Sequence, residues 1–173
     1  MATQNPSIEL RYDSSFKQSI TERERPDPLV GMKIKVGDLY VFGDENHVNS
    51  DYMTTNLTVQ LEATEKILTN ETVVVEYANG PMWLVIESED ENSIRITECP
   101  TIEGVNNPEQ RLSIEKSAVV SKESWIRELI ETAEEFYRKV TDLNPDLEDD
   151  SMLRRLHEEI EGAKRRLKEI EIS

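Results

Sequence analysis

The sequence predicts an α+β protein in which an antiparallel sheet carries one inserted helix and a C-terminal helical hairpin. Short segments that alternate apolar and polar residues, as half-buried strands do, recur through the first 120 residues. Two apolar stripes at helical intervals follow residue 121. We therefore divide the 173 residues into a β-rich acidic domain, residues 1–120, and a helical hairpin, residues 121–173, which packs on the sheet or mediates dimerisation.

The first strands are predicted from alternation. Residues 7–12 alternate, and residues 32–42 contain two apolar runs separated by Gly37-Asp38, which indicates one bent strand or a tight hairpin. Residues 22–28 are expected to form a loop because their prolines lack the N–H group that ladders and helices use. Polar residues 43–49 are also expected to form a loop.

Residues 51–70 fit two patterns. Leu57, Val59 and Leu61 alternate like a strand, whereas residues 62–66 are poor strand material. Five side chains would share one helical face: Met53, Leu57, Leu61, Thr64 and Leu68. This spacing favours a helix over about residues 52–69, with Ser50 or Asp51 as its cap.

A meander of three antiparallel strands is predicted next. It comprises residues 72–77, 82–86 and 93–97, with Asn79-Gly80 at the first turn, since this dipeptide tolerates the positive φ angles of tight hairpins. Residues 100–108, rich in Gly and Asn, should form a loop, and residues 111–114 a last strand.

The remainder of the chain is predicted to be helical. Val120 and Trp125 flank the candidate cap Ser121 at the spacing of a hydrophobic staple, and Asn144-Pro145 ends the first stripe. The second stripe is the predicted helix interface, packed against the preceding helix or against a second copy of the chain, and comprises Leu153, Leu156, Ile160, Ala163, Leu167 and Ile170.

The acidic residues are unevenly distributed. Thirty-six acidic and 20 basic residues give a net charge of −16, and residues 44–110 contain 14 acidic residues against only Lys66 and Arg95. A direct nucleic-acid binder or a protein bound to an anionic membrane needs a basic surface, so both classes are disfavoured. The acidic side chains are either a solvated coating or a docking face for a basic protein.

The sequence contains no pattern that indicates chemistry. Cys99 is the only cysteine, its acidic neighbourhood does not favour a thiolate, and His47 and His157 belong to different elements. No phosphate-binding glycine loop or nucleophile elbow occurs. We therefore expect no enzyme, no cofactor and no metal site. The lone cysteine and the polar first ten residues favour a cytoplasmic location.

The predicted partner-binding residues are the acidic residues of the β-rich domain. One group runs from a strand into its turn, where like charges repel one another without a cationic partner. The other acidic candidates lie on the inserted helix and an earlier strand. Together they are Glu87, Glu89, Asp90, Glu91, Glu62, Glu65 and Glu76.

The order of elements resembles that of small acidic α+β immunity-type proteins of polymorphic toxin systems. The resemblance covers residues 30–140 and lies in the Asn79-Gly80 turn, the strand Met82-Trp-Leu-Val-Ile86 and the helix that opens with Trp125-Ile-Arg-Glu-Leu129. It implies a protein that occludes a toxin's active site and has no catalytic residues. The last helix, residues 151–173, departs from that pattern.

The predicted function is therefore a non-catalytic acidic protein that sequesters or inhibits a basic protein partner. Two alternatives remain open. In the first, carboxylates mimic phosphates and the chain inhibits a DNA- or RNA-binding protein. In the second, the chain is a structural or assembly subunit that forms a homodimer through its last helix.

Overall fold

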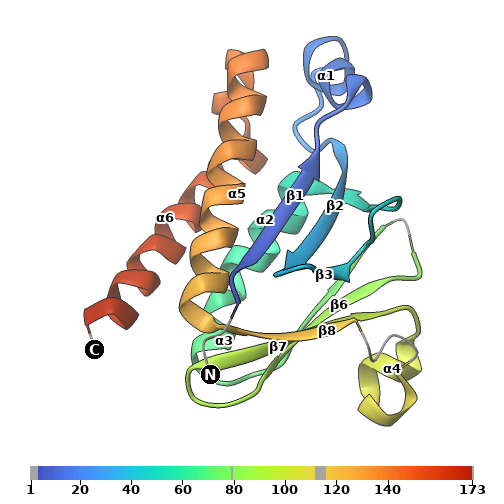
Figure 1. Ribbon diagram of the computed structural model, residues 1–173. Coiled ribbons are helices and arrows are strands. Elements are labelled where there is room, and N and C mark those ends of the chain that lie inside the picture. The colour runs from blue at the N-terminus through green and yellow to red at the C-terminus, as the bar shows by residue number, and fades with distance from the viewer. Residues whose placement is uncertain (1–3, 79, 112–115, 173) are drawn as a thin grey trace.

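The computed structural model (Figure 1) describes residues 4–78, 80–111 and 116–172. It has two four-stranded sheets, antiparallel throughout, and six α-helices within these ranges. The α+β class predicted from the sequence is therefore confirmed. The strands, however, form two sheets where the sequence suggested one, because the chain changes from one sheet to the other through the helical segment after residue 52.

The first sheet is built around β2 (Leu29–Val36), which pairs with β1 (Pro6–Arg11) and β3 (Leu39–Phe42). The start of β2 also pairs with β4 (Asn49–Tyr52). Of the two interpretations of Gly37-Asp38 the hairpin is correct, and Gly37 has a φ of +61° that side chains other than glycine rarely adopt. The prediction of a loop over residues 43–49 is wrong at Asn49, which begins β4. The residues of β4 are polar, but they pair with the start of β2.

The second sheet has the order β5 (Val73–Glu76), β6 (Trp83–Ser88), β7 (Ser93–Cys99) and β8 (Ser117–Ser121). The predicted meander corresponds to β5, β6 and β7. Asn79 of its predicted turn lies outside the described residues. So does the predicted strand 111–114 apart from Arg111, which belongs to no strand. β8 is the fourth strand.

Four helices surround these sheets before the C-terminal pair. The predicted helix 52–69 is divided at Ala63 into α2 (Met53–Glu62) and α3 (Thr64–Leu68). Two short helices occupy segments without a predicted helix: α1 (Ser14–Thr21) and α4 (Ile102–Asn106), the latter within the expected loop 100–108. Each begins at a side-chain cap, Asp13 for α1 and Thr101 for α4. Short 3₁₀ helices cover Pro108–Gln110 and Pro145–Asp149.

The C-terminal pair comprises α5 (Lys122–Leu143) and α6 (Ser151–Ile172), joined by the short 3₁₀ helix. Ser121 ends β8 and also caps α5, because its Oγ accepts the Ser124 N–H at 3.0 Å. α5 packs on β1, and α6 packs on α2 and α5 (Figure 1). Within this single chain Ile170 is partly buried and the other stripe residues are buried: Leu153, Leu156, Ile160, Ala163 and Leu167.

A partly buried ion pair between Lys116 and Glu98 connects the two sheets. The Glu98 carboxylate of β7 accepts the Gly43 N–H at 3.0 Å and the Asn49 side-chain amide at 3.2 Å, both from the first sheet or its loops. Lys116 lies 2.7 Å from Glu98 and also donates to the Gly43 carbonyl at 2.6 Å. A buried charge needs such partners, and here they fix one sheet against the other. Among the described helices, none combines the length and apolar character needed to cross a membrane.

Candidate protein-binding surface

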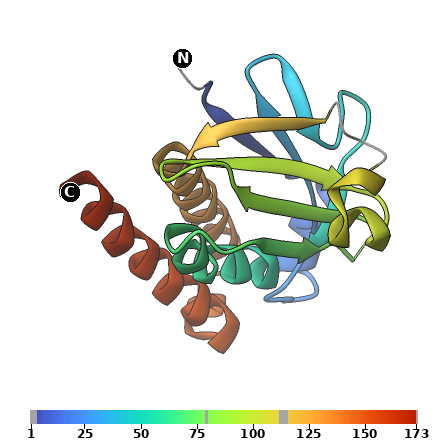
Figure 2. The ribbon, with the colours of Figure 1, turned by 90° about the horizontal axis from the view of Figure 1, so that it is seen from below.

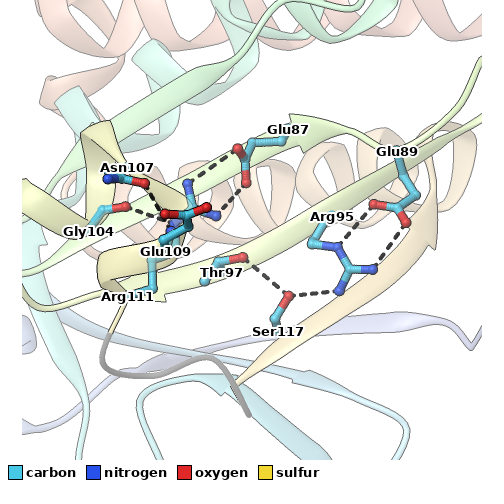
Figure 3. A network of polar contacts seen from close by, with 9 residues as sticks. All are labelled: Glu87, Glu89, Arg95, Thr97, Gly104, Asn107, Glu109, Arg111 and Ser117. Atoms are coloured by element: carbon cyan, nitrogen blue, oxygen red, sulfur yellow. Dashed lines mark hydrogen bonds and ion pairs between the residues drawn. The ribbon is translucent and has the colours of Figure 1, made fainter.

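The outer face of the second sheet contains the two arginine–glutamate pairs in Figure 3. Alternation along β6 and β7 directs Ile86, Ile94 and Ile96 into the core, and therefore directs Glu87 and Arg95 to the opposite face. Figure 2 looks onto this sheet, with α4 at one end, α5 behind it and α6 to one side. The glutamates predicted to bind a partner on this face thus lie beside basic side chains.

Glu87 is held by Arg111 (Figure 3). The guanidinium Nη1 lies 2.6 Å from Oε1 and Nη2 lies 3.2 Å from Oε2, a two-point pairing. Nε of Arg111 donates to the Gly104 carbonyl at 2.8 Å, so the same side chain fixes α4. With only 7% of the Arg111 side chain exposed, this pair is part of the fold. Glu87 is therefore not a free docking carboxylate.

Glu89 is also paired, but at the surface. Arg95 donates to it through Nε at 3.0 Å and Nη2 at 3.1 Å, and through Nη1 to the Ser117 hydroxyl at 3.0 Å (Figure 3). Hydrogen bonds from Arg95 lower the pKa of Glu89. An exposed pair of this kind contributes at most about 1 kcal/mol, so it can open when another cation approaches.

Other acidic side chains gather where α2, α3 and β5 meet the β6–β7 turn. Glu62, Glu65 and Glu71 line one shallow hollow, together with Val59 and other residues: Ala63, Lys66 and Thr69. We call the acidic edge the exposed residues Glu62, Glu65, Glu71, Asp90 and Glu91, together with Glu76 at the far end of β5, where it pairs with Trp83.

A polar contact connects the two parts of the acidic edge. The Ser88 hydroxyl donates to Asn70 Oδ1 at 3.3 Å and to the Asp90 carbonyl at 3.2 Å. Asn70, which directly precedes Glu71, also accepts a hydrogen bond from Lys122. The β6–β7 turn therefore lies next to the start of β5, with Asp90 and Glu71 on adjoining segments.

The acidic edge has few internal counter-ions. Glu62 lies 3.4 Å from Arg155 in an exposed pair. Among the described residues, no ion pair involves the other members: Glu65, Glu71, Glu76, Asp90 and Glu91. Hydrogen bonds from the backbone of Asn92 lower the pKa of Asp90, which keeps it charged in mildly acidic solution. Most of these carboxylates therefore have no ion-pair partner among the described residues, although Lys66 lines the same hollow and Lys122 also lowers the pKa of Asp90.

The structure brings together most, but not all, of the residues predicted to bind a partner. Glu62 and Glu65 share the hollow, and Asp90 and Glu91 lie on the adjoining turn. Glu87 and Glu89 are paired on the sheet face. Sequence reasoning missed Glu71, whose only sequence signal is its place within the acidic segment 44–110.

The side chains with potential for chemistry do not form a reactive cluster. Cys99 is buried at the end of β7, and burial raises the pKa of its thiol. His47 contacts Asp44 in an exposed loop, and His157 is exposed, with its ring tilted against that of Tyr137. Within the described part of the chain, no group of three or more His, Cys, Asp or Glu residues has the arrangement to hold a metal ion.

Comparison of this chain with protein-family models, with curated proteins and with solved structures finds no match in any of the three.

Proposed function

We propose that the protein is a non-catalytic binding protein whose acidic edge docks a basic protein partner. The observation that supports this proposal is the exposed, largely unpaired carboxylate group at the junction of α2, α3, β5 and the β6–β7 turn. Elsewhere on the second sheet, Glu87, Glu89 and Glu98 have arginine or lysine partners from the same chain.

Electrostatic complementarity would allow the acidic edge to attract a basic partner. Unpaired charges of one sign attract an oppositely charged partner over about 10 Å at 0.1 M salt and speed its encounter. Exposed Val59 lies in the hollow beside the carboxylates and offers an apolar contact once the partner has docked. The resemblance to immunity-type proteins suggests that docking inhibits the partner, and the single Cys99 suits binding in the cytoplasm.

The test compares two triple variants that change the total charge equally, from −16 to −13. The first neutralises the acidic edge with Glu65→Gln, Glu71→Gln and Asp90→Asn. The control neutralises exposed carboxylates outside the acidic edge with Asp142→Asn, Glu148→Gln and Glu158→Gln. Each amide keeps an oxygen that accepts hydrogen bonds, so local turns are preserved.

A partner captured from native lysate by the wild type is then purified, and its association rate with each variant is measured across a salt series. We expect the acidic-edge variant to associate at least several-fold more slowly at low salt, and the control variant to stay close to the wild type. Equal rates for the two variants would contradict docking at the acidic edge.

A further inference from the structure

We propose that the outer edge of β5 is the element that receives the partner, by adding an extended basic segment of it as a fifth strand of the second sheet. This inference rests on the proposed function and specifies the conformation and chemistry of the docking segment. It depends on the direction of the β5 backbone groups, on the absence of lysine, proline or a bulge in β5, and on the charges at its two ends.

The register shows which backbone groups of β5 point outward. The Tyr77 N–H donates to the Met82 carbonyl at 2.9 Å, so Tyr77 and Met82 form a hydrogen-bonded antiparallel pair. Such pairs alternate with non-hydrogen-bonded ones along a ladder. The pairs Val74–Val85 and Glu76–Trp83 are therefore non-hydrogen-bonded, and the N–H and C=O groups of Val74 and Glu76 point away from β6.

The fold caps other outward N–H groups but leaves these two open. Glu128 of α5 accepts the N–H of Ile8 on β1 at 2.9 Å, and Asp51 accepts the N–H of Ala78, just beyond β5, at 3.2 Å. No strand of the described chain pairs with the outer side of β5, and no hydrogen bond to the N–H of Val74 or Glu76 is present among the described residues.

Edge strands are usually protected by short length, charged side chains, proline or a bulge. β5 is four residues long and ends in Glu76, but its sequence Val-Val-Val-Glu has no lysine or proline, and its register with β6 has no bulge. Val74, which faces away from the core, is 45% exposed. β5 thus offers unpaired hydrogen-bonding groups beside an apolar side chain, which is the arrangement used in strand addition.

Charge determines the kind of segment that β5 would pair with. Glu71 precedes β5 and Glu76 ends it. The lysines that flank β8, the other edge of the same sheet, are already bonded within the chain: Lys116 pairs with Glu98, and Lys122 donates to Asn70. Cross-strand neighbours on one face of a sheet interact directly. A segment paired with β5 would therefore place an apolar side chain opposite Val74 and a lysine or arginine opposite Glu76. A basic segment is therefore favoured at β5, whereas β8 itself contains no acidic residue.

The probe is the peptide acetyl-Lys-Thr-Val-Thr-Lys-amide, which reads the same in both directions and so needs no assumption about strand orientation. Its acidic counterpart, with glutamate in place of both lysines, is the charge control. Amide hydrogen exchange of the wild-type protein is measured by NMR with each peptide. We expect the basic peptide at saturation to slow exchange of the Val74 and Glu76 amides at least tenfold and to leave the Val119 amide of β8 unchanged.

Two proline variants then test the pairing itself. Val74→Pro removes an outward N–H from β5, and Val119→Pro removes the corresponding group from β8, since the Arg95–Val119 pair is also non-hydrogen-bonded. The affinity for the basic peptide should fall at least tenfold in Val74→Pro and should stay unchanged in Val119→Pro.

Unchanged exchange at Val74 and Glu76 in the wild type would overturn the inference, whether or not the proline variants fold. Equal binding by the two proline variants would overturn it too. These results are separate from the salt series above: a charge-dependent partner without strand addition refutes only this inference, and a partner insensitive to the acidic-edge substitutions refutes the proposed function.

Discussion

The partly buried pair between Glu98 and Lys116 offers the sharpest test of how the two sheets are joined. Replacing Lys116 with methionine keeps most of the side-chain volume but leaves the Glu98 carboxylate with only the Gly43 and Asn49 donors. Breaking a fully buried pair costs about 3–5 kcal/mol. Since 22% of the Lys116 side chain is exposed, against 7% for Glu98, we expect a loss of about 2–3 kcal/mol.

The loss is measured by urea unfolding and by thermal melts followed with circular dichroism. For a chain of this length each kcal/mol shifts Tm by about 2–4 °C, so the expected fall is roughly 5–10 °C. Adding Glu98→Gln to Lys116→Met should recover part of the stability, because the amide oxygen still accepts the Gly43 N–H and no charge remains buried.

Arg95→Met is the matched control, since it breaks an exposed pair with Glu89. That substitution should cost about 1 kcal/mol or less. A Lys116→Met variant that is no less stable than Arg95→Met would refute the reasoning that the buried pair holds the sheets together.

Four further predictions concern the core, the helices and the surface. Ile160→Asp, which places a charge on the buried α6 stripe, should cost at least about 3 kcal/mol in urea unfolding; an unchanged Tm would mean that α6 is not packed. Burial raises the pKa of Glu128 above the ordinary glutamate value of 4.5, so the folded state holds its proton more tightly, and the stability that this group contributes falls as the pH rises above that value. Glu128→Gln should therefore lose less stability than the wild type over that pH range. The Cys99 thiol should react with an aromatic disulfide reagent only on unfolding, and rapid labelling of the native protein would contradict its burial. Thermal melts with and without EDTA should superimpose, and a fall of many degrees on chelation would reveal a bound metal.

The long, periodic elements could be predicted from the sequence because their own residues determine them. The stripe from Leu153 to Leu167 is buried in the structure, and the Ser121 cap lies where its spacing predicts. The short helices α1 and α4 could not be predicted from the sequence. α1 buries only Phe16 and Ile20, which is too few apolar positions to establish a helical period.

The division into two sheets and the partners of the carboxylates could not be predicted, because both depend on contacts between distant segments. Alternation identifies a strand but not the strand it pairs with. Glu87 meets Arg111 from 24 residues away, and Glu62 meets Arg155 from 93 residues away. Charge counting therefore treats paired Glu87 and unpaired Glu65 alike, and only the folded arrangement separates them.

The hydrogen bond between Ile8 and Glu128 has a consequence for synthesis of the chain. The two residues are 120 positions apart, so a ribosome adding about 5–20 residues per second takes roughly 6–24 s to reach the glutamate after the isoleucine. During that interval the outer side of β1 lacks the helix that later covers it. During this interval the nascent chain can pair through β1 with neighbouring chains. Slowing translation between the codons for Ile8 and Glu128 should therefore increase aggregation of the nascent chain.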